Sequence, residues 1–156
     1  MASITACLWF NGRIEEAAAF YVSVFKDAKI TSRSHYGEGA PSPKGTPMAV
    51  TLDIFGQPFM LLNGGPHFSQ SEAVSFMVPC ETQDEVDYYW SRLTADGGQE
   101  NVCGWLKDKF GVSWQIVPSI ISRVMQEQNA AKTERLMKVV MDMRKPDVAA
   151  LTAAVH

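Results

Sequence analysis

Hydrophobic residues in the first third of the chain follow a strand pattern, then a helical pattern, then a strand pattern again. Residues 3–10 form an apolar run that ends at Asn11 and Gly12, which is typical of a buried strand. Apolar residues then recur at helical spacing and predict one buried helix face, at Ile14, Ala17, Ala18, Tyr21, Val24 and Phe25. Three further strands are expected at residues 29–36, 48–54 and 58–63. The pattern predicts a unit of one strand, one helix and three strands.

The same order of patterns returns in the second half of the chain. Residues 14–21 (IEEAAAFY) are matched by residues 83–90 (QDEVDYYW), and residues 55–62 (FGQPFMLL) are matched by residues 110–117 (FGVSWQIV). Strands of the second copy are expected at 73–80, in two short segments within 98–109, and at 112–117. Such an internal duplication predicts the same architecture for both copies.

Beyond Pro118 the duplication ends and the chain continues in helical patterns, at residues 119–128, 133–144 and 146–155. We therefore expect an α+β fold made of two tandem βαβββ units and a C-terminal helical tail. The chain would form a single domain, with unit one at 3–64, a linker at 65–72, unit two at 73–118 and the tail at 119–156.

Capping residues mark the starts of the expected helices. Asn11 or Gly12 can cap the first helix. Thr82, followed three residues later by Glu85, forms a capping box before the helix of the second copy. In the tail, two helix starts are expected at Thr133 and Pro146.

Composition excludes several classes of function. The formal net charge is −3 and the charged residues are interspersed, so no basic stripe is available for nucleic acid or an anionic membrane surface. No apolar run approaches the roughly 20 residues that a membrane-spanning helix needs. Three cysteines without a CxxC pair, and no secretory signal, indicate free thiols and a cytoplasmic location.

Several segments together resemble the vicinal oxygen chelate superfamily, which holds glyoxalase I, extradiol dioxygenases and bleomycin-resistance proteins. The segments are LWFNGRIEEAAAFYVSVF, GQPFMLLNGGP, CETQDEVDYYW and CGWLKDKFGVSWQIVP, with RKPDVAAL in the tail. They look like its PhnB-like branch, often labelled 3-demethylubiquinone methyltransferase-like, over residues 3–118. The resemblance implies that the sheets form an open, curved cleft and that two chains form a homodimer.

The superfamily also implies four metal-ligand positions, two in each unit. Carried over residue by residue, they fall at Ala6, Met60, Ser75 and Gln115. Catalytic divalent metals need imidazole, carboxylate or thiolate donors, whereas these residues offer at most a thioether and neutral oxygens. Moving the second position from Met60 to Asn63 does not change this. We therefore expect no bound metal and no cofactor.

Strand alternation predicts which side chains line the cleft. The cleft face is expected to include Ala6, Leu8, Phe10, Met77, Pro79 and Val117, and the helix-covered face Trp9, Phe59, Phe76 and Trp114. The candidate ligand-binding residues are Thr51, Asp53, Met60, Ser75, Ser113 and Gln115. Asp53 and its equivalent Asp108 also suit the binding of backbone amides beside tight turns. Ser75 and Gln115 also suit a satisfied polar pair between the units.

No residue can be assigned as catalytic from the sequence. His35 and His67 lie in or beside loops, and either would be the candidate if a general base exists. Neither has a nucleophile at a recognisable spacing. The cysteines need no role beyond that of small hydrophobic residues.

These features favour a metal-free small-molecule binding protein of the glyoxalase/bleomycin-resistance type, with its ligand unidentified. The alternative is a metal-independent enzyme that acts on a small organic substrate, so enzyme activity is left open. Quinone methyltransferase activity is only the label of the branch. The turn at 11–13 has one glycine, and the sheet pattern is not the parallel α/β type that usually binds S-adenosylmethionine.

Overall fold

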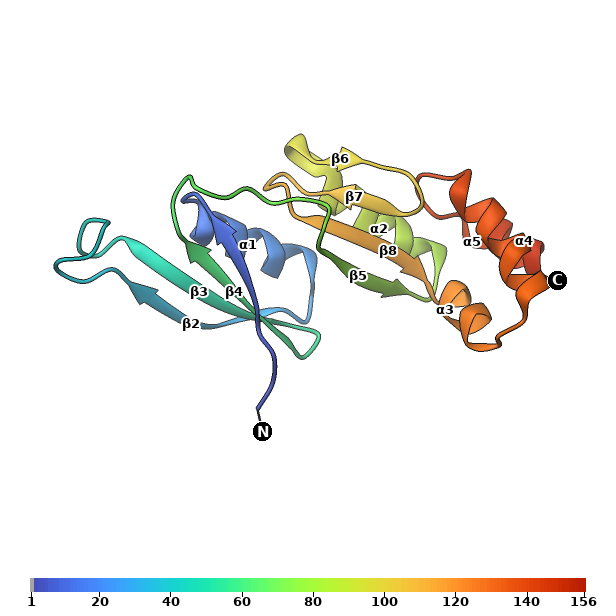
Figure 1. Ribbon diagram of the computed structural model, residues 1–156, viewed down its shortest axis with the longest axis horizontal. Helices are drawn as coiled ribbons and strands as arrows, with labels where there is room; N and C mark the ends of the chain where they lie inside the picture. Colours follow the sequence, from blue (N-terminus) through green and yellow to red (C-terminus); the bar gives the residue numbers. More distant parts are fainter. Residues whose placement is uncertain (1) are drawn as a thin grey trace. The chain divides into compact units, whose positions relative to one another are not determined.

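The chain folds into two compact units that divide between Gln70 and Ser71, and the computed structural model describes residues 2–156. Each unit contains a four-stranded mixed sheet with a helix on one face (Figure 1). The first strand of each unit is parallel to the last, and the other strand pairs are antiparallel. The predicted α+β fold of two tandem βαβββ units and a helical tail is confirmed.

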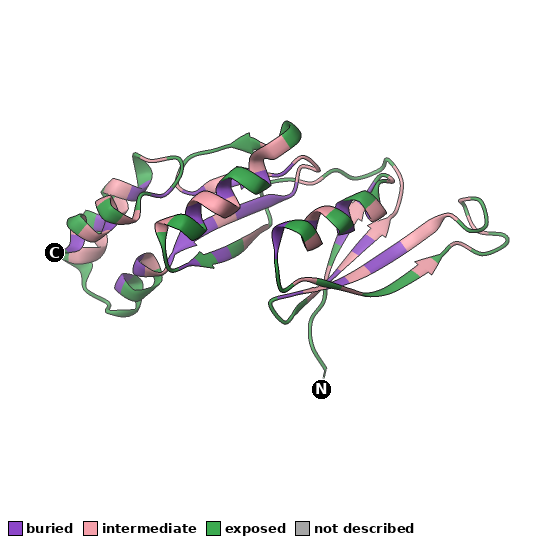
Figure 2. Cartoon of the chain, turned by 180° about the vertical axis from the view of Figure 1, so that it is seen from behind, coloured by how far each residue is buried: buried purple, intermediate pink, exposed green. Residues whose placement is uncertain are grey.

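The first unit has its core between one helix and one face of its sheet. Its elements are β1 (Ala6–Phe10), α1 (Ile14–Val24), β2 (Lys29–His35), β3 (Pro47–Ile54) and β4 (Gln57–Asn63), with strand order β1-β4-β3-β2. Leu61 on β4 is paired with Leu8 on β1 and with Val50 on β3, and all three are buried. The apolar stripe of α1 is also buried, so these side chains form the core beneath the helix (Figure 2).

Helix α1 begins without a side-chain cap, so the predicted cap at Asn11 or Gly12 is wrong. The N-cap is Arg13, whose backbone is left-handed with a φ of 58°, and its guanidinium pairs with Glu16 at 2.9 Å. The Gly12 amide donates instead to Asn63 Oδ1 on β4 at 2.9 Å. The turn before α1 is therefore tied to the last strand of its own sheet.

The second unit repeats this arrangement, and its second and third strands are shorter than those of the first unit. Its elements are β5 (Ser75–Cys80), α2 (Gln83–Thr94), the 3₁₀ turn η1 (Ala95–Gly97), β6 (Gln99–Glu100), β7 (Trp105–Lys107) and β8 (Ser113–Pro118). The strand order is β5-β8-β7-β6. Helix α2 buries Val86, Trp90 and Leu93, and the sheet buries Trp114 and Ile116. One covered sheet face again forms the core.

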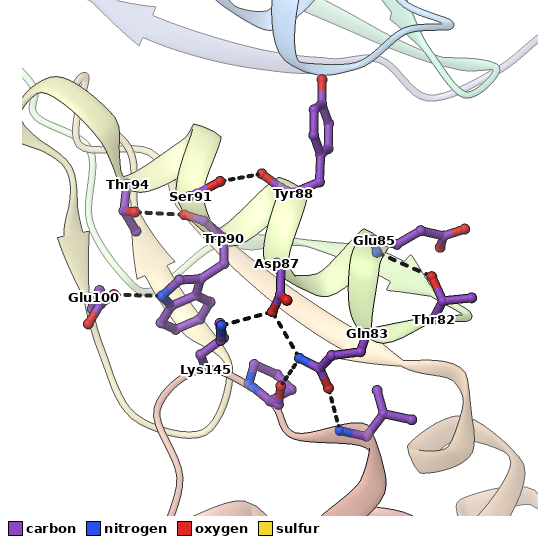
Figure 3. A network of polar contacts seen from close by, with 12 residues as sticks. Thr82, Gln83, Glu85, Asp87, Tyr88, Trp90, Ser91, Thr94, Glu100 and Lys145 are labelled. Carbon is purple, nitrogen blue, oxygen red and sulfur yellow. Dashed lines mark hydrogen bonds and ion pairs between the residues drawn. The ribbon is translucent and has the colours of Figure 1, made fainter.

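Helix α2 begins at the predicted cap. Thr82 Oγ1 accepts a hydrogen bond from the Glu85 amide at 3.2 Å (Figure 3). The Glu85 carboxylate accepts from the amide of Glu81 at 2.9 Å, one residue earlier than in an ideal capping box. Both contacts satisfy amides that have no partner within the helix.

Three helices form the tail, α3 (Ser119–Gln126), α4 (Ala130–Met141) and α5 (Val148–Val155). They share a small apolar core of Ile120, Val124, Leu136, Val140, Leu151 and Val155. The predicted starts at Thr133 and Pro146 are wrong, because Asn129 caps α4 and Asp147 caps α5. No helix within residues 2–156 has the length and apolar character needed to cross a membrane.

A polar cluster attaches the tail to α2 (Figure 3). Gln83 Nε2 donates to Asp87 Oδ1 at 2.9 Å and to the Pro146 carbonyl at 3.0 Å, and Gln83 Oε1 accepts from the Val148 amide at 2.8 Å. Asp87 also pairs with Lys145 at 2.8 Å. The start of α5 is therefore held by one side chain of α2.

Candidate functional site

Strand register corrects the match between the two units by one residue. Met60 pairs with Cys7 in the first sheet, and its equivalent Gln115 pairs with Met77 in the second. The first strands are therefore offset by 70 residues, although the helices are offset by 69. The cause is the turn before each helix, which has three residues at 11–13 and two at 81–82.

Ala6 is consequently misplaced in the predicted metal-ligand quartet. With an offset of 70, the equivalent of Ser75 is Thr5, which is exposed. Ala6 pairs with the buried Phe59 on the helix-covered side of the sheet. Thr5, which takes the place of Ala6 in the quartet, adds only one neutral hydroxyl to the set of possible metal donors.

The predicted faces of the first unit are wrong at β1 for the same reason. Leu8 and Phe10 are buried on the helix-covered face, whereas Trp9 lies on the opposite face. We call the sheet face opposite the helix the open face of each unit. Trp9 is covered there by the segment that follows β4, since its Nε1 donates to the Gly65 carbonyl at 2.8 Å and its ring meets the edge of Phe68 at 4.9 Å.

Three predicted ligand-binding residues lie together on the open face of the first unit. Thr51 is opposite Met60, and Asp53 is two residues along β3 from Thr51, so their side chains share one face. All three are half-buried. Asp53 Oδ1 accepts from the Gly56 amide at 2.9 Å, which is the turn role that the sequence also suggested. Whether this group binds a ligand stays a prediction.

The other three predicted residues lie together on the open face of the second unit. Gln115 Nε2 donates to Ser75 Oγ at 2.8 Å, so this polar pair forms within one unit. Ser113 pairs with Ser75 across the parallel strands. Ser113 is 2% exposed, and its hydroxyl has no hydrogen-bond partner among the described residues. A buried polar group without a partner requires an explanation.

Two charged residues complete this group, and the sequence pattern had not indicated them. Lys107 on β7 is the register partner of Ser113 on the side away from Ser75. Its ammonium forms an ion pair with Glu72, which precedes β5 by three residues. The hydrogen bond from Lys107 lowers the pKa of Glu72. Lys107 lies on the same face as Ser113 because the two residues are register partners of β7 and β8, and the sequence does not show this register.

The donors at the four family positions do not fit a catalytic divalent metal. Thr5, Ser75 and Gln115 supply neutral oxygens, and Met60 supplies a thioether. The Asn63 amide is already engaged, accepting from Gly12 and donating to the Pro47 carbonyl. Among residues 2–156, no group of three or more His, Cys, Asp or Glu side chains could hold a metal ion.

Asp108 and Cys80 are buried, and their contacts have structural roles. Asp108 is 2% exposed and accepts from the amides of Phe110 and Val112 and from Trp114 Nε1. Burial raises the pKa of the Cys80 thiol to about 12, so this thiol stays protonated and unreactive at neutral pH. His35 and His67 are exposed, and a role as general base stays a prediction.

Comparisons with known proteins agree with this fold. Residues 2–117 match the family model of 3-demethylubiquinone-9 3-methyltransferase. A PhnB protein from Bacillus cereus, which carries the same enzyme name, is 36% identical over 75% of this chain and 99% of that chain, with a TM-score of 0.67. No curated protein matches the sequence.

Two more distant structures show the fold alone. A protein from Pseudomonas aeruginosa is 20% identical over 76% of this chain and 98% of that chain, with a TM-score of 0.63. The fosfomycin resistance protein FosX from Listeria monocytogenes, complexed with Mn(II) and sulfate, is 14% identical over 81% of this chain and 98% of that chain, with a TM-score of 0.56.

The family model and the Bacillus cereus structure together show that the chain belongs to the 3-demethylubiquinone-9 3-methyltransferase family, the PhnB-like branch of the vicinal oxygen chelate superfamily.

Proposed function

We propose that the protein binds a small, partly apolar molecule without a metal, as a binding protein of the glyoxalase/bleomycin-resistance type. The observation that carries the proposal is the chemistry of the four family positions. Thr5, Met60, Ser75 and Gln115 lack imidazole, carboxylate and thiolate groups, and neutral donors do not hold a divalent transition metal against water. FosX has the same fold and was solved with Mn(II). Whether a protein of this fold binds a metal therefore depends on its side chains and not on the fold.

The open faces supply the binding groups in this proposal. Each unit has its own group on its own open face, with Thr51, Asp53 and Met60 in the first unit and Ser75, Ser113 and Gln115 in the second. Apolar surface lies beside the second group, since Met77 is 61% exposed and Trp105 is half-buried. A few polar groups set in apolar surroundings are typical of small-molecule sites.

Methyl transfer, which the family name denotes, is the second candidate. It is favoured by the family match alone. The turn at 11–13 does not suit S-adenosylmethionine in the way that a glycine-rich turn does, because the Gly12 amide is already donated to Asn63. A metal-independent enzyme is compatible with the same open faces, with His35 or His67 as the general base.

Metal analysis tests the proposal. The purified full chain is exposed in turn to Mn(II), Zn(II) and Ni(II), dialysed and assayed for metal, with FosX as the positive control. We expect well under one metal ion per chain. A stoichiometric ion that survives dialysis would overturn the metal-free assignment.

A thermal-shift screen separates binding from methyl transfer. A specific ligand at 100 times its dissociation constant stabilises the folded state by about 2.7 kcal/mol. We expect small aromatic and polar organic compounds to raise the melting temperature. S-adenosylmethionine at millimolar concentration should leave it unchanged, and a clear rise would favour the second candidate.

We also propose that two chains form a homodimer in the cytoplasm. Exposed Met125 and Met141 in the tail offer apolar contact surface for a second copy. The three cysteines are free in the structure, which suits a reducing compartment. Light scattering of the purified chain measures the mass directly, and a monomer at micromolar concentration would contradict the dimer.

A further inference from the structure

The open face of the second unit contains a cation and two hydroxyls in one row across its strands, with an amide beside them. Ser75 on β5, Ser113 on β8 and Lys107 on β7 are successive register partners. Gln115 lies two residues from Ser113 on the same face and donates to Ser75. We call these four residues the polar row.

Ser113 is the member of the row that points to a ligand. It is 2% exposed, and its Oγ has no partner among residues 2–156. A hydroxyl buried in this way costs free energy unless another group completes its hydrogen bond. Its neighbours across the strands are a hydroxyl and an ammonium, and these are donors that complement an oxygen anion.

A carboxylate of the chain itself already pairs with the cation of this row. Glu72 precedes β5, and its carboxylate reaches Lys107 on the far side of β8. The ion pair therefore connects the β5 side to the β7 side at the level of Ser113. The side chain of Glu72 is 52% exposed and that of Lys107 is 31% exposed, so the pair can open without unfolding the sheet.

We propose that the polar row binds the carboxylate of a small aromatic or apolar acid, and that Glu72 occupies this anion position in the free protein. The ligand carboxylate displaces Glu72 from Lys107 and accepts the hydrogen bond of Ser113. The rest of the ligand lies over Trp105 and Met77, which share the open face with the row. This inference rests on the proposed binding function and adds the chemical class of the ligand.

Benzoate and its neutral counterpart benzamide are suitable probes. Each is titrated into the full chain and followed by amide chemical shifts in NMR. Benzoate should bind more tightly than benzamide, with the largest shifts at Lys107 and Ser113. Equal binding of the two probes, or shifts confined to other parts of the chain, would overturn the inference.

Variants test the displacement of Glu72. Glu72→Gln should tighten benzoate binding about two- to fivefold, the range that a partly exposed ion pair is worth. The matched control is Glu38→Gln, which removes the same charge from the exposed pair with Lys44 and should change nothing. Lys107→Met should abolish the preference for benzoate over benzamide. An unchanged or weaker affinity in Glu72→Gln would contradict the displacement.

Ser113→Ala separates a binding role from a structural one. Removal of a buried hydroxyl without a partner should raise the melting temperature of the free protein. The same change should weaken benzoate binding about tenfold, since the hydroxyl donates to a charged group. A stabilised variant with unchanged affinity would assign Ser113 no part in binding.

The two proposals fail in different ways. If benzoate and benzamide bind this face equally well, metal-free binding stands and the carboxylate class is wrong. If the dialysed protein retains a stoichiometric metal ion, the metal-free function is wrong whatever the benzoate result.

Discussion

The duplicated aspartates show how much one residue's surroundings decide. Asp53 and Asp108 precede equivalent turns, at Gly56 and Gly111. Asp53 is half-buried and accepts one amide hydrogen bond, whereas Asp108 is buried and accepts three hydrogen bonds, one of them from Trp114. The same residue in the same position of the repeat therefore has a much larger structural role in the second unit.

Asp108→Ala should destabilise the protein far more than Asp53→Ala. Loss of the Asp108 carboxylate leaves three donors without their acceptor, two of them on buried residues, which should cost about 3 kcal/mol or more. Asp53→Ala is the matched control and should cost about 1 kcal/mol. Urea unfolding of both variants measures the difference, and equal losses would contradict the assignment of Asp108 as a buried anchor.

Cys80 should make the protein less stable at alkaline pH. Its thiol has a folded-state pKa of about 12 against an ordinary value of 9.0. Between these values the unfolded chain loses a proton that the folded chain keeps, so the free energy of unfolding falls as pH rises, by up to about 1.4 kcal/mol per pH unit. At neutral pH and below, the thiol is protonated in both states and contributes no slope.

The measurement is the free energy of unfolding of the wild type and of Cys80→Ala as a function of pH. The packing lost in Cys80→Ala makes the two free energies differ by a constant amount. Ionisation of the thiol makes this difference change with pH above about pH 9. Parallel curves up to pH 11 would show that the thiol titrates normally.

At the scale of elements, short connections decide where strands and helices are held. The segment after β4 passes over Trp9, and Gly64 allows this close approach. A Cβ built on Gly64 would lie 2.4 Å from Trp9 Cε2, well inside van der Waals contact. The connection is therefore packed against the open face of the first unit.

Gly64→Ala should displace the Trp9 ring and destabilise the first unit, by about 1–3 kcal/mol as in other overpacked sites. Gly37→Ala is the control, because a Cβ there meets nothing within 4 Å and its φ is not left-handed. Thermal unfolding compares the two variants. A neutral Gly64→Ala would show that the segment after β4 moves freely from Trp9.

Gln83→Ala should loosen the start of α5. The side chain makes hydrogen bonds to Asp87, Pro146 and Val148, and their loss removes about 1–2 kcal/mol from this attachment. Hydrogen exchange of the Val148 amide should quicken while the β8 amides stay protected. Gln126→Ala, at an exposed position on α3, is the control, and equal exchange in both variants would contradict the role of Gln83.

For the whole molecule, the two units share a fold but differ in the chemistry of their open faces. The first carries Thr51, Asp53 and Met60, with Trp9 covered by the chain. The second carries the polar row with Lys107 and Ser113. A change in function on a constant fold requires only such substitutions.

Chelation should leave the stability of the whole chain unchanged. A protein that owes folding energy to a bound metal loses it when the metal is removed. The melting temperature with EDTA should equal that without EDTA. A fall on chelation that is restored by one added divalent metal would show a bound ion and contradict the metal-free proposal.

Periodicity and the repeated segments were sufficient to predict the two βαβββ units and the helical tail, whereas the family was predicted from the resemblance of particular segments. These features depend on local hydrophobic spacing and on segments that can be compared directly along the chain. The Thr82 cap was predictable for the same reason, because its partner is three residues away. A polar pair of Ser75 with Gln115 was one of two alternatives that the sequence left open, but the pair forms within the second unit and not between the units.

The faces of β1 and the members of the polar row depended on pairing between distant strands. One extra residue in the turn before α1 shifts β1 against its repeat, and a shift of one residue moves every side chain to the other face. This is why Ala6 was misplaced and why Trp9 lies on the open face. Lys107 joins Ser113 only through the β7–β8 register, and Glu72 reaches it from a segment outside any strand. Spacing along the chain predicts the elements, whereas strand register decides which side chains meet.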